Sequence, residues 1–125
     1  MDGMREIKFR GWYGSKIGMM TPTFNGDINK IFAEEDGIYT QFTGLKDRNG
    51  VDIYGGDIAL DPVKNIKGVI CYDSHQARYK FVPLDLYHAN AGNGGWTGLE
   101  LNVNRRLPEV VGNIYENPEL LIEEQ

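Results

Sequence analysis

The stretch Gln41-Phe-Thr-Gly-Leu-Lys-Asp-Arg-Asn-Gly-Val-Asp-Ile-Tyr-Gly-Gly-Asp-Ile58 decides the fold of this chain. It holds an apolar run, a polar turn ending in Asn49-Gly50, a second apolar run, and a glycine pair that leads into a third. Apolar runs separated by Asn-Gly are typical of a β-hairpin with a type I′ turn, because both central positions of that turn need positive φ. The residues predicted to face inward here are Val51, Ile53, Ile58 and Leu60.

Further short segments on both sides of this hairpin have strand character. Residues 5–12 alternate, with Ile7 and Phe9 on one face, and period-two alternation indicates a half-buried strand. The other predicted strands cover residues 16–20, 37–43, 67–72, 78–84, 97–103 and 109–115. Asn117 followed by Pro118 predicts a short C-terminal helix, since Asn is a favoured N-cap and Pro fits the first turn. Residues 27–35 fit a helix and a strand equally well.

Composition supports a protein of many turns and short strands. Glycine supplies 16 of 125 residues, well above the usual level of about 7%, and glycine is costly inside helices. We therefore predict a mainly β fold. The C-terminal strands are expected to close into a small β-barrel, because an open sheet of this size would leave unpaired edges. The predicted division is a β-rich N-terminal subdomain, residues 1–45, and a barrel with a short helix, residues 46–125.

The bulk properties exclude several classes of protein. The formal net charge is −5, which argues against a dedicated polyanion binder, because affinity for phosphate backbones comes chiefly from Lys and Arg. A single cysteine, Cys71, allows no intramolecular disulfide and suits a reducing compartment. The N-terminal residues lack the apolar core of a signal peptide, and no apolar run reaches membrane-spanning length. We expect a soluble, cytoplasmic protein that does not associate with membranes.

Three segments resemble the YopX family of small phage and prophage proteins. They are Arg5–Trp12, Gln41–Ile58 and Val110–Leu121, at both ends and in the middle of the chain. Family members usually have Ala and an acidic residue around the first-strand Trp, where this chain has Gly11 and Tyr13. The resemblance implies a β-rich N-terminal part joined to an SH3-like barrel, a phage or prophage setting in the bacterial cytoplasm, and no known reaction. It therefore transfers no catalytic residues.

Several residues could carry chemistry, and each has a structural interpretation that we favour. Cys71, Asp73 and His75 would share one face of a strand and could donate to zinc, although a structural zinc site normally has four ligands. We favour a buried Cys71 and a turn from Asp73 to His75. Asp47 and Asp57 are expected to accept hydrogen bonds from the backbone of their own turns. We predict no catalytic residues, no metal and no cofactor.

The candidate binding residues are aromatic or basic. We predict Trp12, Tyr13, Trp96, Arg105 and Arg106 as contact residues. Trp96 ends the glycine-rich stretch 90–95, and we favour its anchoring this loop in the core over its being an exposed contact. The leading hypothesis is a non-enzymatic protein-interaction module that contacts itself, a host protein or a phage protein, as a homo-oligomer. The alternative is a nucleic-acid-binding barrel, in which Arg5, Lys8 and Arg10 join the two C-terminal arginines.

Overall fold

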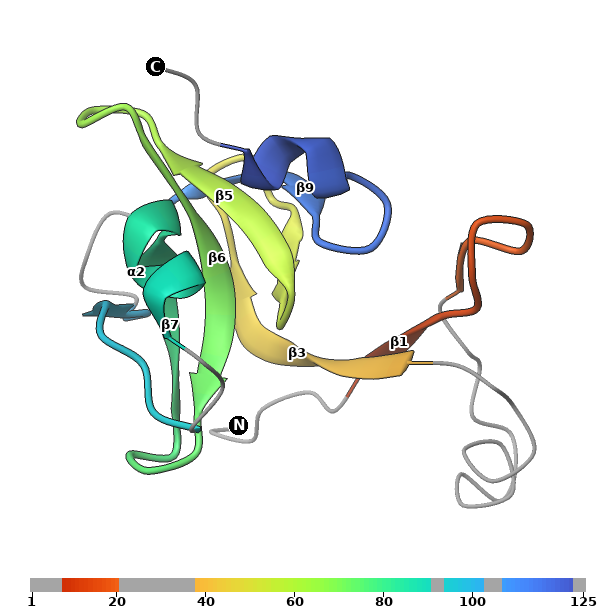
Figure 1. The fold of residues 1–125 in the computed structure, drawn as a ribbon, viewed down its shortest axis with the longest axis horizontal. Helices are drawn as coiled ribbons and strands as arrows, with labels where there is room; N and C mark the ends of the chain where they lie inside the picture. Colours follow the sequence, from red (N-terminus) through yellow and green to blue (C-terminus); the bar gives the residue numbers. More distant parts are fainter. Residues whose placement is uncertain (1–7, 21–37, 91–93, 103–106, 123–125) are drawn as a thin grey trace.

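The structure, a computed structural model, describes residues 8–20, 38–90, 94–102 and 107–122 and has two antiparallel sheets (Figure 1). The first sheet has the strand order β2-β1-β3-β4. Its strands are β1 (Phe9–Trp12), β2 (Met19–Met20), β3 (Ile38–Lys46) and β4 (Asp52–Tyr54). Residues 27–35, for which helix and strand were equally expected, lie outside the described residues, as do Arg5, Arg105 and Arg106.

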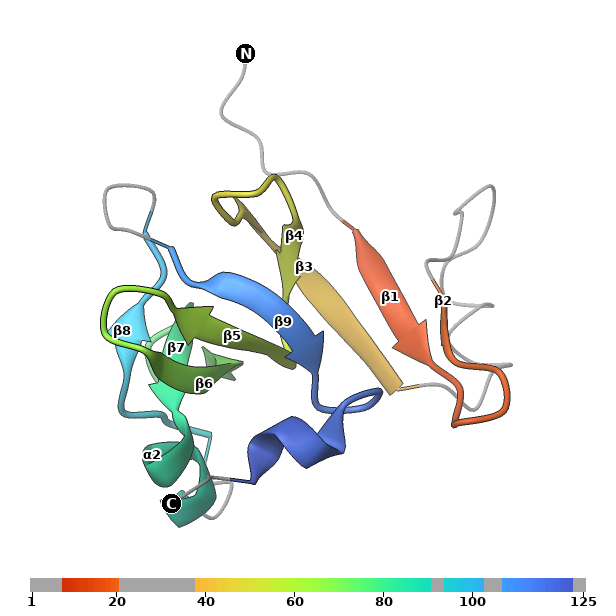
Figure 2. The same cartoon turned by 90° about the horizontal axis from the view of Figure 1, so that it is seen from above.

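The second sheet has the order β8-β7-β6-β5-β9 and curls into a half-barrel (Figure 2). Its strands are β5 (Asp57–Asp61), β6 (Ile66–Asp73), β7 (Arg78–Pro83), β8 (Leu99–Glu100) and β9 (Glu109–Asn113). The mainly β prediction is confirmed. The chain passes from one sheet to the other at Gly55-Gly56, while the division into domains at residue 45 stays a prediction.

The predicted hairpin joins β3 to β4, but its turn differs from type I′. Positive φ outside glycine occurs, among the described residues, at Asn65 and Ala77, so Asn49 does not adopt it. Gly50 does, with φ of +81°. The carboxylate of Asp47 accepts the N–H groups of Asn49 at 2.9 Å and Val51 at 3.0 Å, which holds the turn in a form that needs one left-handed residue. The same turn leaves Val51 44% exposed, so its predicted inward position is wrong.

The core lies on both faces of the half-barrel because side chains alternate along β6 and β7. On one face Ile70 and Phe81 pack with Ile53 and Ala59. On the other, Val69 and Val82 pack with Cys71 and Leu84. Ile58, also in β5, is fully buried, and burial of such a side chain contributes about 1.5 to 3 kcal/mol.

Two short helices cover the second face of the half-barrel. The helix α2 (Leu84–Ala89) follows Pro83 and places Leu84 and Tyr87 on the core. It was not predicted, because its six residues are too few for a helical period to show. The predicted C-terminal helix is present as the 3₁₀-helix η1 (Pro118–Leu121). Asn117 does not cap it with its side chain, whose oxygen instead accepts the N–H of Asn113 at 3.2 Å.

Candidate functional site

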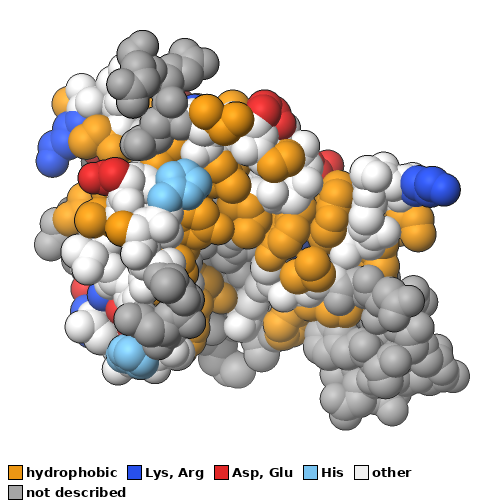
Figure 3. Space-filling view, viewed as in Figure 1, with side chains coloured by type: hydrophobic (Ala, Val, Ile, Leu, Met, Phe, Trp, Pro, Cys, Tyr) orange, Lys and Arg blue, Asp and Glu red, His pale blue; other side chains and the backbone are white. Residues whose placement is uncertain are grey.

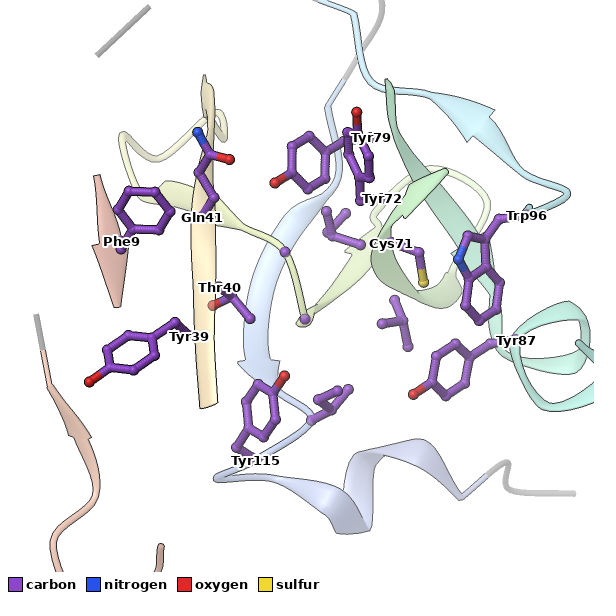
Figure 4. Close-up of a pocket in the computed structure, with 15 residues that line it drawn as sticks. Phe9, Tyr39, Thr40, Gln41, Cys71, Tyr72, Tyr79, Tyr87, Trp96 and Tyr115 are labelled. Atoms are coloured by element: carbon purple, nitrogen blue, oxygen red, sulfur yellow. The ribbon is translucent and has the colours of Figure 1, made fainter. Parts of the chain in front are cut away.

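A cleft of about 580 Å³ lies between the two sheets and opens to solvent. Apolar side chains gather across this part of the surface (Figure 3), and Figure 4 shows the lining residues from both sheets facing one another. Of the lining residues that the structure describes, seven are aromatic and none is Asp, Glu, Lys, Arg or His. The aromatic ones are Phe9, Tyr39, Tyr72, Tyr79, Tyr87, Trp96 and Tyr115, and the others are Thr40, Gln41, Gly55, Gly56, Val69, Ile70, Cys71 and Ile114.

The glycine pair joins the two walls of this aromatic cleft. The N–H of Gly55 donates to Gln41 in β3 at 3.1 Å, and the N–H of Gly56 donates to Ile70 in β6 at 2.8 Å. Gly56 has φ of +86°, and a β-carbon there would lie 3.1 Å from the Tyr115 ring. A β-carbon at Gly55 would lie 3.2 Å from the Tyr79 ring. Glycine therefore lets two aromatic rings close on the backbone at the point where the sheets meet.

One wall of the cleft is built on the half-barrel by stacked aromatic rings. Tyr87 of α2 and Trp96 stack with ring centroids 5.4 Å apart and an interplanar angle of 10°. Both are half-buried and pack on the cluster that contains Val69 and Cys71. Burial raises the pKa of Tyr87, so its hydroxyl stays neutral. The prediction that Trp96 anchors its loop is confirmed, and the same side chain also lines the cleft.

Two further aromatic side chains, Trp12 of β1 and the adjacent Tyr13, support Tyr115, which follows β9, and Tyr39 of β3. Trp12 stacks on Tyr115 with centroids 6.2 Å apart, and the hydroxyls of Tyr13 and Tyr39 lie 2.6 Å apart. A β-carbon at Gly11 would lie 2.8 Å from Tyr39, so the absence of a side chain there makes room for the tyrosine pair. Trp12 and Tyr13 therefore lie behind the cleft and support it, rather than lining it.

A buried ion pair ties the first sheet to the start of the second. Arg10 Nη2 of β1 lies 2.6 Å from Asp57 Oδ1 of β5, and the guanidinium also lies over the Tyr54 ring, 4.6 Å from its centroid. The other carboxylate oxygen of Asp57 accepts the N–H of Tyr54 at 2.7 Å, which confirms the predicted role in its own turn. Burial raises the pKa of Asp57 to about 6, although Arg10 acts to lower it.

A second buried ion pair holds Trp96 in place. Lys80 Nζ lies 2.7 Å from Asp73 Oδ2 and donates to the carbonyl of Trp96, also at 2.7 Å. Asp73 accepts backbone N–H groups from His75, Gln76 and Trp96. The hydrogen bond from Lys80 and these backbone donors hold the pKa of Asp73 well below its usual range.

The candidate zinc ligands have these structural roles instead. Burial raises the pKa of the Cys71 thiol to about 12, and Cys71 belongs to the core. Asp73 forms the turn to His75, as favoured from the sequence. Within the described parts of the chain, no group of three His, Cys, Asp or Glu side chains is placed to hold a metal ion.

The predicted basic residues are only partly covered by the structure. Arg10 pairs with Asp57, and Lys8 Nζ lies 2.5 Å from Asp52 and above the Phe42 ring. Arg5, Arg105 and Arg106 lie outside the described residues, so their clustering stays a prediction.

Sequence reasoning missed most of the cleft. Of its seven aromatic residues it named Trp96 alone as a candidate site residue. The missed ones are Phe9, Tyr39, Tyr72, Tyr79, Tyr87 and Tyr115. The available signal was the number of aromatic residues, 14 of 125, but nothing local indicated that these would converge.

The chain is similar to a protein family and to a solved structure whose descriptions name no activity. The family model described as "YopX protein" matches residues 16–122. The crystal structure of protein EF1440 from Enterococcus faecalis matches with 25% sequence identity and a TM-score of 0.50, covering 95% of this chain and 100% of that chain. No curated protein matches the chain significantly. In the described residues, no helix is both long and apolar enough to cross a membrane.

Proposed function

Because the chain belongs to the YopX family, we propose that it is a non-enzymatic protein-interaction module that receives a segment of its partner in the aromatic cleft. The observation that carries the proposal is the cleft itself, about 580 Å³ with seven aromatic side chains in its lining. Aromatic residues dominate the energetics of protein interfaces because each offers a large apolar surface at low entropic cost.

The chemistry of the polar groups near the cleft supports the non-enzymatic part of the proposal. The Cys71 thiol, with its pKa raised to about 12, is protonated and a poor nucleophile at neutral pH. A ring nitrogen of His88 contacts the carbonyl of Leu121 at 2.7 Å, and His75 packs against Gly94 and Gly95. Neither histidine lines the cleft, so neither is placed as a base beside the thiol.

The proposal also covers where the protein acts and whether it associates with copies of itself. We place the protein in the cytoplasm of a bacterium that carries the phage or prophage, and we retain the SH3-like description of the half-barrel. Self-association is supported by Ile17, Met20 and Ile38 on the first sheet and its turn, which are 66%, 49% and 53% exposed. Light scattering of the purified chain at high concentration tests the homo-oligomer; a monomer would remove this part alone.

The binding site is tested with a partner captured from host lysate on the immobilised full chain and then purified. We expect Tyr72→Ala, at an exposed lining position, to weaken binding of that partner about tenfold. The matched control is Val63→Ser, which removes a side chain that is 68% exposed and outside the cleft. Equal binding by wild type, Tyr72→Ala and a second cleft variant, Tyr87→Ala, would overturn the proposal.

A further inference from the structure

We infer that the segment bound in the aromatic cleft is an uncharged, proline-rich stretch in the polyproline II conformation. This inference rests on the proposed function and specifies the chemistry of the ligand. Three features of the described residues lead to it. The lining residues carry no charge, the backbone carbonyls where the two walls meet already accept hydrogen bonds, and the aromatic rings present flat surfaces to the cleft.

The neutral lining selects against charged ligands. The lining residues that the structure describes include no charged side chain. Lys8 and Arg10, which flank Phe9, are already paired with Asp52 and Asp57. A nucleic acid would bring phosphates against described lining residues that include no cation, on a chain of net charge −5. A strongly acidic or basic peptide would likewise lose hydration without gaining a counter-charge. A peptide without charged side chains is the electrostatic match.

The backbone of the cleft is poorly placed to add a strand. Where β3 and β6 face the cleft, the carbonyls of Gln41 and Ile70 already accept hydrogen bonds from Gly55 and Gly56. Beyond these points β4 pairs with β3 from Phe42, and β5 pairs with β6 up to Val69. Only short strand ends remain toward the cleft, so a ligand is held chiefly by side chains.

The ring arrangement suits polyproline II. This helix has no internal hydrogen bonds, and its proline rings are apolar while its carbonyls stay free to accept. The Tyr87–Trp96 stack offers a broad flat surface, and Tyr72 and Tyr79 meet edge-on with centroids 5.0 Å apart. Figure 4 shows the Trp96 indole nitrogen and the Tyr87 hydroxyl directed into the cleft, where they can donate to carbonyls. Aromatic grooves recognise proline-rich segments in this way at low entropic cost.

The test uses synthetic decaproline, with a Gly-Ser peptide of equal length as control, added to the isotope-labelled full chain. Amide and indole NMR signals are followed. We expect saturable shifts of Trp96 and of the lining residues with decaproline and none with the Gly-Ser peptide. Tyr72→Ala is expected to weaken decaproline binding about tenfold, whereas Val63→Ser leaves it unchanged. Tyr87→Ala provides a second cleft variant.

Each other occupant gives a distinct result. If the cleft signals shift with oligothymidylate and not with decaproline, the inference is overturned in favour of a nucleic acid. If they shift when the concentration of the chain alone is raised, it is overturned in favour of a second copy of the chain. Absence of decaproline binding, or binding outside the cleft, would also overturn it. If partner binding still depended on Tyr72 and Tyr87, the proposed function would stand while the proline-rich ligand fell; if neither bound through the cleft, both would fall.

Discussion

Asp57, at the junction of the two sheets, and Asp73, beneath the Trp96 loop, are both buried carboxylates paired with a cation, and their side chains are 1% and 3% exposed. Their pKa values nevertheless move in opposite directions. Burial raises the pKa of Asp57 to about 6, whereas the hydrogen bond from Lys80 and the backbone donors lower that of Asp73. Asp57 accepts one backbone N–H and Asp73 accepts three. Desolvation therefore outweighs Arg10 and one backbone donor at Asp57, whereas the hydrogen bond from Lys80 and three backbone donors outweigh desolvation at Asp73.

The difference matters because each carboxylate holds a different part of the aromatic cleft. Asp57 joins β5 to Arg10 of the first sheet and so fixes how the two walls meet. Asp73 and Lys80 hold the backbone of Trp96 on the half-barrel. The junction is consequently expected to respond to mildly acidic pH, while the Trp96 loop is expected to keep its tether there.

Replacing Arg10 by Met should have the largest effect. The variant leaves Asp57 buried with one backbone donor and without its counter-charge. Breaking a buried ion pair by removing one partner costs about 3 to 5 kcal/mol in the free energy of unfolding. Urea denaturation at neutral pH measures the loss.

The control for this variant is the double substitution Arg10→Met with Asp57→Asn. It removes both charges and should recover most of the lost stability. If the double variant is as unstable as Arg10→Met alone, the loss comes instead from the packing of the guanidinium on the Tyr54 ring.

The second prediction concerns pH. Because the pKa of Asp57 rises from 3.8 to about 6, the folded state binds its proton more tightly than the unfolded state. Asp57 thus adds stability that is fully present below pH 3.8 and is lost as the pH rises through about 6. The free energy of unfolding of wild type relative to Asp57→Asn should fall by about 2 kcal/mol between about pH 4 and about pH 7. A pH-independent difference, measured by urea denaturation across this range, would show that the folded state leaves the pKa of Asp57 unshifted.

The third prediction repeats the removal of a cation at the other site. In Lys80→Met, Asp73 keeps its three backbone donors, so we expect a smaller loss of stability than in Arg10→Met. The carbonyl of Trp96 loses its bond from Lys80, and acrylamide should quench Trp96 fluorescence more in a Trp12→Phe background. An equal or larger loss than that of Arg10→Met would contradict the role given to the backbone donors.

The same two sites indicate what the sequence could predict. The turn roles of Asp47, Asp57 and Asp73 are local, set by a carboxylate beside the N–H groups of its own turn, and all three were predicted. The Arg10–Asp57 pair joins residues 47 positions apart, and no pattern in the sequence matches them. The hairpin was likewise predicted from Asn49-Gly50. Its turn type was not, because it depends on the Asp47 carboxylate, which accepts the N–H groups of Asn49 and Val51.

The cleft was beyond local patterns for a similar reason. Its aromatic residues come from both sheets, the helix α2 and two loops, and each alone is consistent with an ordinary core residue. Their convergence depends on the angle between the sheets, which Gly55-Gly56 and the Arg10–Asp57 pair set together. The glycine pair was recognised as a sharp turn or a close packing point, but the rings that approach it could not be named.

The smallest effect is expected at Asp52, a third carboxylate with cationic partners. Lys46 Nζ lies 2.6 Å from Asp52 and Lys8 Nζ lies 2.5 Å away, and both hydrogen bonds lower the pKa of Asp52. Lys46 is 59% exposed, so water already solvates its charge. Lys46→Ala should therefore change the free energy of unfolding by less than about 1 kcal/mol, and added salt should reduce even that. A loss as large as that of Lys80→Met would mean that proximity of opposite charges, rather than burial and backbone donors, sets the strength of ion pairs in this protein.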